Sequence, residues 1–203
     1  MRKLPAVLLV LLVVGLAAQA QDTPRLEIFT GYSFVSAGFP FSPDPDAGNT
    51  RGSLHGWDLT ATVNANRWFG IAGDFGGYYG SATKVELFKP TNCVLCTGNV
   101  NATLHNIHTF AGGPQVSVRA EKMAVFGHVL LGGAHVRADF SGVGGSATAS
   151  KTDFTVIVGG GVDLEFSHHL AFRVQPDYFL TQILDRSQNN FRLSAGVVFR
   201  FGQ

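Results

Sequence analysis

The sequence is poor in charged residues, and the two signs are almost balanced. Only 14% of its 203 residues are charged, and 15 basic against 14 acidic residues leave a net charge of +1. An average soluble domain has about 25% charged residues, whereas a nucleic-acid-binding domain gathers basic residues on one face. The composition therefore argues against a nucleic-acid partner and against an ordinary cytosolic domain.

Long apolar runs are also missing after the N-terminus, so the sequence contains no candidate transmembrane helix there. The exception is the apolar stretch 6–18, which follows Arg2 and Lys3 and leads into Ala18-Gln19-Ala20. That small-x-small pattern is typical of a signal peptidase site. We predict a cleaved signal peptide at residues 1–20 and one mature domain at residues 21–203; the alternative is a retained membrane anchor.

Cysteine is scarce. Cys93 and Cys96 are the two in the chain, and they lie in a predicted loop. A secreted protein meets an oxidising compartment, so a disulfide between them is the preferred interpretation. Half of a zinc site is the alternative, but a structural zinc site needs a second pair of ligands. The sequence predicts no metal and no cofactor.

The mature chain does have a clear alternation of apolar and polar residues, which is typical of strands with one apolar face. In the second segment, for example, Trp57 and Leu59 alternate with Asp58 and Thr60. Two further segments, 102–118 and 123–136, alternate less clearly because histidines interrupt them, and their faces stay unassigned. Together these segments predict eight strands and no helix; the six clear ones are residues 26–35, 57–66, 68–79, 153–166, 170–181 and 191–201.

Short and long connections alternate between these segments. Three connections are predicted to be tight, at residues 66–67, 119–122 and 167–169. The other four are predicted as long loops, at residues 36–56, 80–100, 137–152 and 182–190. This order predicts an up-and-down antiparallel barrel with short turns at one rim and longer loops at the other.

The ionisable residues decide which face points inward. Ten of them lie on the face opposite the large apolar residues: Glu27, Asp58, Asp74, Asp153, Asp163, Glu165, Arg173, Asp177, Arg192 and Arg200. A soluble barrel with an apolar interior is the alternative. However, eight strands enclose too little space for so many large apolar side chains, and aromatic residues gather near both ends of the strands, as in membrane barrels. The prediction is an all-β, eight-stranded antiparallel transmembrane β-barrel.

The last segment, residues 190–202, resembles the final strand of bacterial outer-membrane proteins, and residues 159–163 and 170–178 resemble the penultimate hairpin of small OmpA-type barrels. This resemblance implies a location in the bacterial outer membrane and contact with its lipid and lipopolysaccharide. It also implies handling by periplasmic chaperones and by the barrel assembly machinery, with Phe199 and Phe201 as the assembly signal.

The inward charges are the candidate site. We interpret Asp163, Glu165, Arg173, Asp177, Arg192 and Arg200 as a structural ion-pair network in the lumen, because isolated charges there would be unfavourable; a pore gate is the alternative. The histidines at 105, 108, 128 and 135 are interpreted as scattered structural residues and not as a catalytic or metal site. The predicted function is structural, envelope-stabilising or surface-interacting, without enzymatic activity and with four longer extracellular loops. The alternatives are an outer-membrane lipid-modifying enzyme and a narrow porin.

Overall fold

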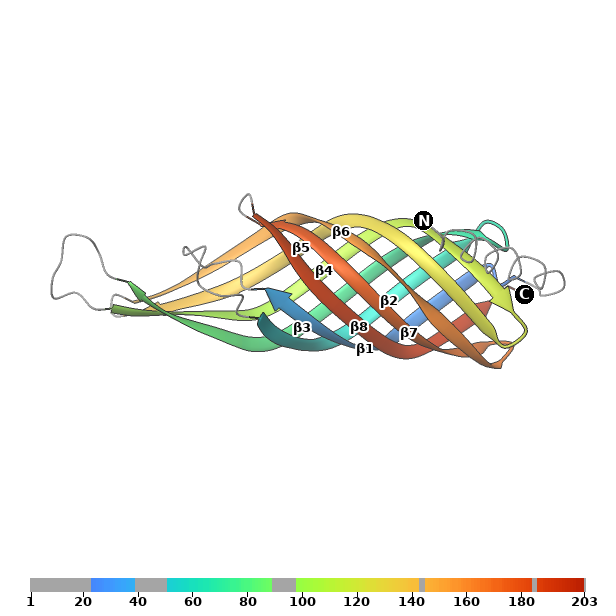
Figure 1. The fold of residues 1–203 in the computed structure, drawn as a ribbon, viewed down its shortest axis with the longest axis horizontal. Coiled ribbons are helices and arrows are strands. Elements are labelled where there is room, and N and C mark those ends of the chain that lie inside the picture. The colour runs from blue at the N-terminus through green and yellow to red at the C-terminus, as the bar shows by residue number, and fades with distance from the viewer. Residues whose placement is uncertain (1–22, 39–50, 89–97, 143–144, 184–185, 203) are drawn as a thin grey trace, which may run out of the picture.

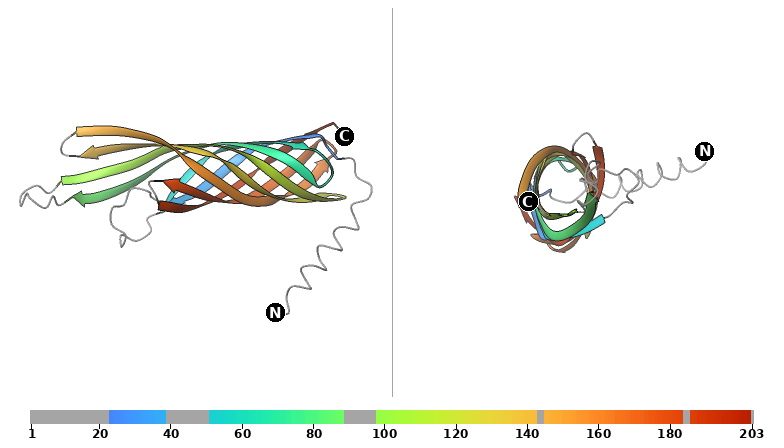
Figure 2. Two further views of the ribbon diagram at one scale, coloured as in Figure 1. Left: turned by 90° about the horizontal axis from the view of Figure 1, so that it is seen from above. Right: turned by 90° about the vertical axis from the view of Figure 1, so that its left-hand side faces the viewer.

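The computed structural model describes residues 23–38, 51–88, 98–142, 145–183 and 186–202, which form one closed barrel (Figure 1). Its strands are neighbours in chain order, and β1 pairs with β8 from Leu26↔Phe201 to Ser36↔Phe191. The strands are β1 Leu26–Gly38, β2 Arg51–Asn64, β3 Phe69–Phe88, β4 Gly98–Ala120, β5 Met123–Gly142, β6 Gly145–Ser167, β7 Leu170–Ile183 and β8 Arg186–Phe201. The predicted strand number, antiparallel order and closure are confirmed, and the view along the axis shows the ring (Figure 2).

Alternation along each strand places polar side chains in the lumen and apolar side chains on the outer wall. In β2, Trp57 and Leu59 are exposed outside, whereas Asp58 and Thr60 are fully buried inside. The same rule assigns the two strands whose faces the sequence left open. In β4 and β5 the lumen-facing residues are Thr109, Ala111, Gln115, Ser117, Arg119, Ala124, Phe126, His128, Leu130, Ala134 and Val136.

Three short turns gather at one end of the barrel, which we call the turn end; the chain enters β1 and leaves β8 there (Figure 1). They connect β2 to β3, β4 to β5 and β6 to β7. In the first turn Asn66 Oδ1 accepts hydrogen bonds from the backbone N–H groups of Trp68 and Phe69, both at 2.9 Å. The three predicted tight turns are thus confirmed.

The opposite end, the far end, carries a sheet that projects beyond the barrel. Strands β3 to β6 have 20, 23, 20 and 23 residues, whereas β1, β2, β7 and β8 have 13, 14, 14 and 16. Pairing with β2 ends at Tyr79, and pairing with β7 begins at Thr155. The four-stranded sheet beyond these points, residues 80–88, 98–105, 138–142 and 145–154, is called the blade (Figure 2).

Strand pairing at the far end corrects the predicted loops. The segment 137–152 is mostly strand, because β5 and β6 pair continuously from Met123↔Leu164 to Gly142↔Gly145. The segment 182–190 is also mostly strand, since β7 and β8 pair as far as Ile183↔Arg186. Glycine, serine and asparagine in these segments favoured loops, but backbone pairing with a neighbouring strand requires no particular side chain. The described flanks of the other two predicted loops, residues 36–38, 51–56, 80–88 and 98–100, are strand as well. The middle parts of these loops, residues 39–50 and 89–97, lie outside the described residues.

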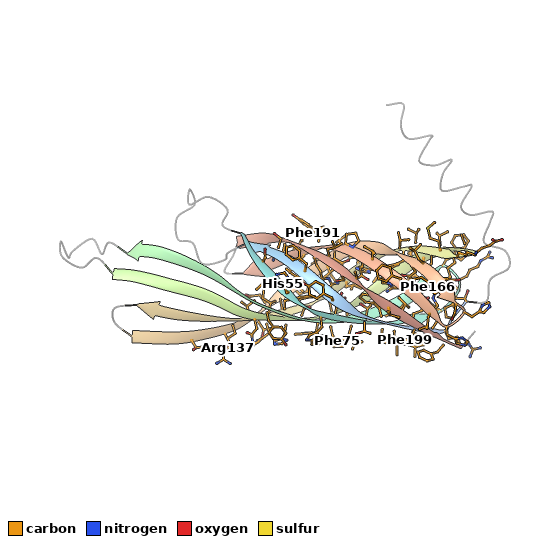
Figure 3. All side chains as sticks on the ribbon, turned by 90° about the horizontal axis from the view of Figure 1, so that it is seen from below. His55, Phe75, Arg137, Phe166, Phe191 and Phe199 are labelled. Carbon is orange, nitrogen blue, oxygen red and sulfur yellow. The ribbon has the colours of Figure 1, made fainter. Side chains whose placement is uncertain are left out.

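Aromatic side chains form a band near each end of the barrel wall. Phe191 lies toward the far end, and Phe166 and Phe199 lie near the turn end (Figure 3). Such bands mark the two membrane–water interfaces of a transmembrane barrel. The exposed members are Tyr32, Trp57, Tyr79, Phe154, Tyr178 and Phe191 toward the far end, and Phe69, Phe166, Phe199 and Phe201 near the turn end.

Two lumen-facing glycines leave room for the polar side chains of neighbouring positions. A Cβ at Gly159 would collide with Asp177 Oδ1, and a Cβ at Gly76 would collide with the hydroxyl of Tyr78. Both Asp177 and Tyr78 take part in the buried polar cluster described next. The small residues that the sequence places on the inner face therefore provide the volume that these larger groups occupy.

Candidate functional site

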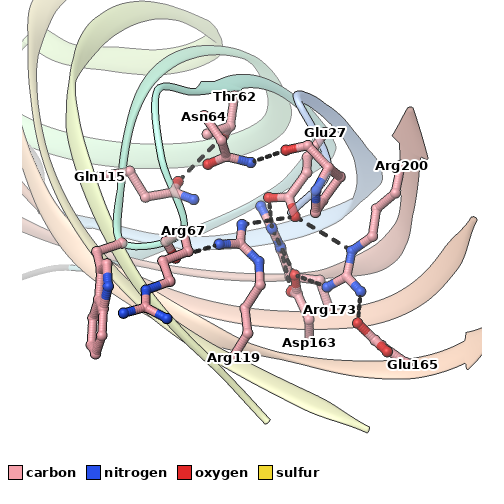
Figure 4. Close-up of polar contacts among 12 residues, drawn as sticks. Glu27, Thr62, Asn64, Arg67, Gln115, Arg119, Asp163, Glu165, Arg173 and Arg200 are labelled. Atoms are coloured by element: carbon pink, nitrogen blue, oxygen red, sulfur yellow. Dashed lines mark hydrogen bonds and ion pairs between the residues drawn. The ribbon is translucent and has the colours of Figure 1, made fainter. Parts of the chain in front are cut away.

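Six charged side chains from five strands form an ion-pair cluster in the lumen near the turn end (Figure 4). We call it the turn-end cluster: Glu27 on β1, Arg119 on β4, Asp163 and Glu165 on β6, Arg173 on β7 and Arg200 on β8. Three guanidinium groups face three carboxylates, so the charges balance. Balance and contact are both needed here, because a buried charge without a partner is strongly destabilising.

Arg173 and Arg200 make most of these contacts. Arg173 holds Asp163 with two parallel bonds, Nε–Oδ1 at 2.7 Å and Nη2–Oδ2 at 2.9 Å. Arg200 reaches Asp163 Oδ2 at 3.3 Å, Glu27 Oε1 at 3.4 Å and also Glu165. The Arg173 guanidinium also lies 4.1 Å from the ring centroid of Phe126. Both arginines are therefore fixed by carboxylates from other strands.

Arg119 ties this cluster to the first turn. Its Nη2 lies 3.1 Å from Glu27 Oε1, and its Nη1 donates to the backbone carbonyl of Arg67 at 2.8 Å (Figure 4). A side chain from β4 thus joins the neighbouring β2–β3 turn to Glu27 on β1. Arg119, Arg173 and Arg200 are at most 7% exposed, so the cluster fills the lumen at this end.

A second cluster lies deeper in the barrel around Arg192, whose side chain is completely buried. We call it the central cluster. Arg192 contacts Asp74 at 3.0 and 2.9 Å, Asp177 Oδ2 at 2.8 and 2.5 Å, and Asp58 Oδ2 at 3.3 Å. These three carboxylates come from β2, β3 and β7, so one guanidinium joins four strands across the lumen.

Further polar side chains add hydrogen bonds to the central cluster, because one arginine cannot satisfy three carboxylates. Ser194 donates to Asp58 at 2.8 Å, Thr60 donates to Asp74 at 3.1 Å, and Gln175 donates to Asp177 at 2.9 Å. His128 Nε2 lies 3.0 Å from Asp177 Oδ1. Arg192 also donates to the hydroxyl of Tyr78 at 2.8 Å. The network therefore draws side chains from five of the eight strands.

Beyond the central cluster, toward the far end, the lumen is apolar. The side chain of Phe179 lies under Arg192, with the guanidinium 4.9 Å from the ring centroid. Phe179 belongs to one buried apolar cluster of Val35, Leu54, Ala72, Tyr78, Ala111, Leu130, Val136, Ile157 and Phe179. Its alanines reach back to the level of Asp74, since Ala111 lies opposite Asp74 and Ala72 lies two residues before it. Side chains thus fill the lumen in layers: balanced ion pairs, an Arg-centred polar cluster, and an apolar layer.

The predicted network residues divide between the two clusters. Asp163, Glu165, Arg173 and Arg200 belong to the turn-end cluster, whereas Asp177 and Arg192 belong to the central cluster. Arg173 and Asp177 lie four residues apart on one face of β7, yet they belong to different clusters. Residues directly opposite each other on neighbouring strands lie much closer together than residues four apart on one strand. The register places Asp163 opposite Arg173 and Arg192 opposite Asp177.

Several cluster residues were not in the predicted network. Arg119 and His128 were missed because the faces of their strands could not be assigned from the sequence. For Arg119 a local signal exists, because Gln115, Ser117 and Arg119 alternate with Val116 and Val118. For His128 no such signal exists, because its neighbours on the same face, Ala124 and Phe126, are apolar. Glu27, Asp58 and Asp74 were predicted to face inward, but no sequence pattern paired them with particular arginines.

The remaining predicted site residues lie elsewhere. Phe199 and Phe201 are exposed on the outer wall near the turn end, and Cys93 and Cys96 lie outside the described residues. Within the part of the chain that the structure describes, no three histidine, cysteine or acidic side chains are arranged to hold a metal ion. No described helix has the length and apolarity needed to cross a membrane.

A closed antiparallel barrel with a polar, filled lumen, an apolar outer wall and two aromatic bands is a transmembrane β-barrel. The chain matches the outer membrane protein beta-barrel domain family over residues 6–201. It belongs to this family, and its place is the bacterial outer membrane.

Solved structures of similar fold come from several bacteria. Ail, the attachment invasion locus protein of Yersinia pestis, is 21% identical with a TM-score of 0.52, and the match covers 88% of this chain and 100% of Ail. Neisserial surface protein A is 12% identical with a TM-score of 0.57, covering 89% and 100%. OprG of Pseudomonas aeruginosa is 12% identical with a TM-score of 0.52, covering 91% and 99%. These identities show a shared fold; no curated protein matches the sequence.

Proposed function

We propose that this outer-membrane barrel has a structural and surface-interaction role, that it conducts no ions, and that it catalyses no reaction. The observation that carries the proposal is the packing around Arg192, whose fully buried guanidinium joins Asp58, Asp74 and Asp177 across the lumen. An eight-stranded barrel has an interior only wide enough for side chains. The central cluster and the apolar layer beyond it fill the lumen, so the barrel serves as a rigid support.

Conductance in planar lipid bilayers tests this against the narrow-porin alternative. The refolded barrel is expected to give no stable current steps at neutral pH. As a comparison, Arg192→Ala together with Phe179→Ala removes two large lumen-filling side chains while leaving the outer wall unchanged. Stable steps from the unmodified protein would contradict the proposal.

The blade supports the surface-interaction part of the proposal. Its two outer strands, residues 80–88 of β3 and 145–154 of β6, have a neighbour on one side within the described residues. We propose that the blade is extracellular, since short turns of such barrels lie on the periplasmic side. A partner at the cell surface would then meet a sheet held rigidly above the membrane.

Labelling of intact cells tests the orientation. In a background with Cys93→Ser and Cys96→Ser, a cysteine introduced by Ser150→Cys on the blade is expected to react with a membrane-impermeant maleimide. The matched control is Ser167→Cys at the turn end, which is expected to react only after the outer membrane is permeabilised. The reverse pattern would place the blade in the periplasm.

The positions of the described histidines support a non-enzymatic role. His128 forms a pair with Asp177, but both side chains are fully buried in the lumen, where no lipid substrate has access. At the far end, His55 and His135 are bonded to the hydroxyls of Tyr32 and Thr152. The alternative, a lipid-modifying enzyme, predicts a change in the mass of lipid A when the protein is expressed in cells. We expect no such change.

Biogenesis adds two further proposals. Residues 1–20 are removed as a signal peptide, which N-terminal sequencing of the protein recovered from outer membranes would show. During transit the unfolded chain is held by periplasmic chaperones and then inserted by the barrel assembly machinery.

A further inference from the structure

Three histidines for which the sequence predicted no shared role lie in one row on the outer wall. His55, His108 and His135 come from β2, β4 and β5. The register places His55 opposite Tyr79 and His108 opposite His135, and the rings of Tyr79 and His108 meet edge to face at 5.7 Å. With their neighbours they cross six adjacent strands; we call this row the histidine belt: Tyr32, His55, Tyr79, His108, His135 and Thr152.

The belt lies at the boundary between the apolar wall and the blade. On the turn-end side of it, Phe75, Phe110 and Leu131 are exposed on the same strands as Tyr79, His108 and His135. On the other side the blade begins, and Figure 3 shows His55 and Arg137 close to this transition. Tyrosine at such a boundary sits at the level of lipid headgroups, and the three histidines lie in the same row as Tyr32 and Tyr79.

Hydroxyl groups orient two of the three imidazoles. The Tyr32 hydroxyl bonds to Nδ1 of His55, and Thr152 Oγ1 lies 2.8 Å from Nδ1 of His135. Nδ1 of each ring is therefore occupied, and Nε2 is the nitrogen left for another partner. The partner of one ring nitrogen fixes the orientation and tautomer of an imidazole.

Among the side chains that the structure describes, Arg137 provides the charge on the outer wall at this level. Arg137 is exposed on the outer wall, two residues beyond His135 on β5. The nearest described carboxylates face the lumen: Asp58 and Asp74 are buried there, and Asp153, which follows Thr152 on β6, alternates with the exposed Phe154 and lies opposite the buried Ala134. An anion in the headgroup region would meet imidazoles and a guanidinium on the outer wall, whereas these carboxylates lie on the other face of their strands.

We propose that the histidine belt and Arg137 bind the phosphate groups of the phosphorylated glycolipid of the outer leaflet, lipopolysaccharide. This inference rests on the extracellular orientation in the proposed function, since that orientation places the belt in the leaflet that contains this lipid. Guanidinium and imidazole N–H groups are strong donors to phosphate oxygens. The apolar wall below the belt provides the surface for the acyl chains, so one lipid contacts both.

Native mass spectrometry of the full barrel in detergent, titrated with diphosphorylated lipid A, tests this site. The belt variant combines His55→Gln, His108→Gln, His135→Gln and Arg137→Gln. The matched control makes the same kind of changes at the turn end: His168→Gln, His169→Gln and Lys122→Gln, all at exposed positions. Heat-dependent migration on gels shows whether each variant is folded, and the single variant Arg137→Gln provides the test if the fourfold variant does not fold.

The belt variant is expected to bind diphosphorylated lipid A about tenfold more weakly than the unmodified protein, as loss of one or two charge-assisted bonds would cause. The turn-end variant should bind as the unmodified protein does, and dephosphorylated lipid A should bind all three equally weakly. Equal binding by the belt and turn-end variants would overturn the proposal. Tighter binding of phosphatidylglycerol than of lipid A would overturn the choice of glycolipid.

Failure here is distinguishable from failure of the proposed function. If the belt variant binds lipid A normally while Ser150→Cys still labels on intact cells and the barrel remains non-conducting, the belt proposal fails alone. If labelling shows the blade in the periplasm, the orientation on which both depend is wrong.

Discussion

Arg192 and Asp74 are 118 residues apart in the chain, yet they meet inside the barrel through two contacts of 3.0 and 2.9 Å. Their strands, β8 and β3, are not neighbours in the sheet. Their contact spans the lumen and exists only because the barrel is closed. Removing either partner therefore tests the closed structure itself.

Replacing Arg192 by leucine is expected to lower the free energy of unfolding by about 3–5 kcal/mol, because it leaves three buried carboxylates without their cation. Urea unfolding in lipid vesicles measures this loss. Arg192→Lys keeps the charge but loses the planar fork of donors, so its loss should be smaller. Adding Asp74→Asn to Arg192→Leu should restore part of the stability; no restoration would mean that the carboxylates are not the cause.

The two clusters should be energetically separate. A double-mutant cycle with Arg173→Leu and Asp163→Asn is expected to give a coupling energy of about 1–3 kcal/mol, as for residues in direct contact. The matched cycle with Arg173→Leu and Asp177→Asn should give a coupling close to zero, because Asp177 bonds to Arg192. Equal coupling in both cycles would show one network and not two.

A charge on the outer wall should destabilise the barrel. Val197 lies on β8 between Phe191 and Phe201, which belong to the two aromatic bands, and its side chain is exposed to lipid. Val197→Arg is expected to cost about 2–4 kcal/mol in the free energy of unfolding. Val197→Leu is the control and should change little; if both variants unfold alike, the outer wall does not face lipid.

A methyl group added at Gly159 should disturb the central cluster, because the new Cβ would overlap Asp177 Oδ1. Gly159→Ala is expected to lower the unfolding free energy by about 1–3 kcal/mol. Gly127 on the neighbouring strand β5 is the matched control: a Cβ there meets its nearest atom, Gly159 O, at 3.7 Å. Gly127→Ala should be tolerated, and a similar loss from both would indicate an effect of strand conformation.

The last strand is expected to carry the assembly signal. Phe201→Ser should reduce the amount of protein in the outer membrane severalfold, since the resemblance to outer-membrane proteins assigns the near-terminal aromatic to recognition by the assembly machinery. Phe166→Ser removes an aromatic side chain that is 76% exposed at the same end but lies on β6. Equal assembly defects would point to the aromatic band and not to the terminal strand.

The sequence alone determined the class of structure. Period-two alternation over residues 57–66 and 191–201 identified strands with one apolar face, and charges such as Asp58 and Arg192 on the opposite face identified the lumen. These properties are local: a one-residue shift exchanges the two faces of a strand, so the pattern records which face is buried. The tight turns were also predictable, because each is a local feature of the chain between two alternating segments.

Tertiary structure decided which residues meet. The pairing of Arg173 with Asp163 and of Arg192 with Asp177 follows from strand register, and the contact between Arg192 and Asp74 follows from closure across the lumen. The blade and the histidine belt likewise depend on how far neighbouring strands pair and on which side chains this brings opposite one another. Register and closure are relations between segments far apart in the chain, and no single segment's composition contains them.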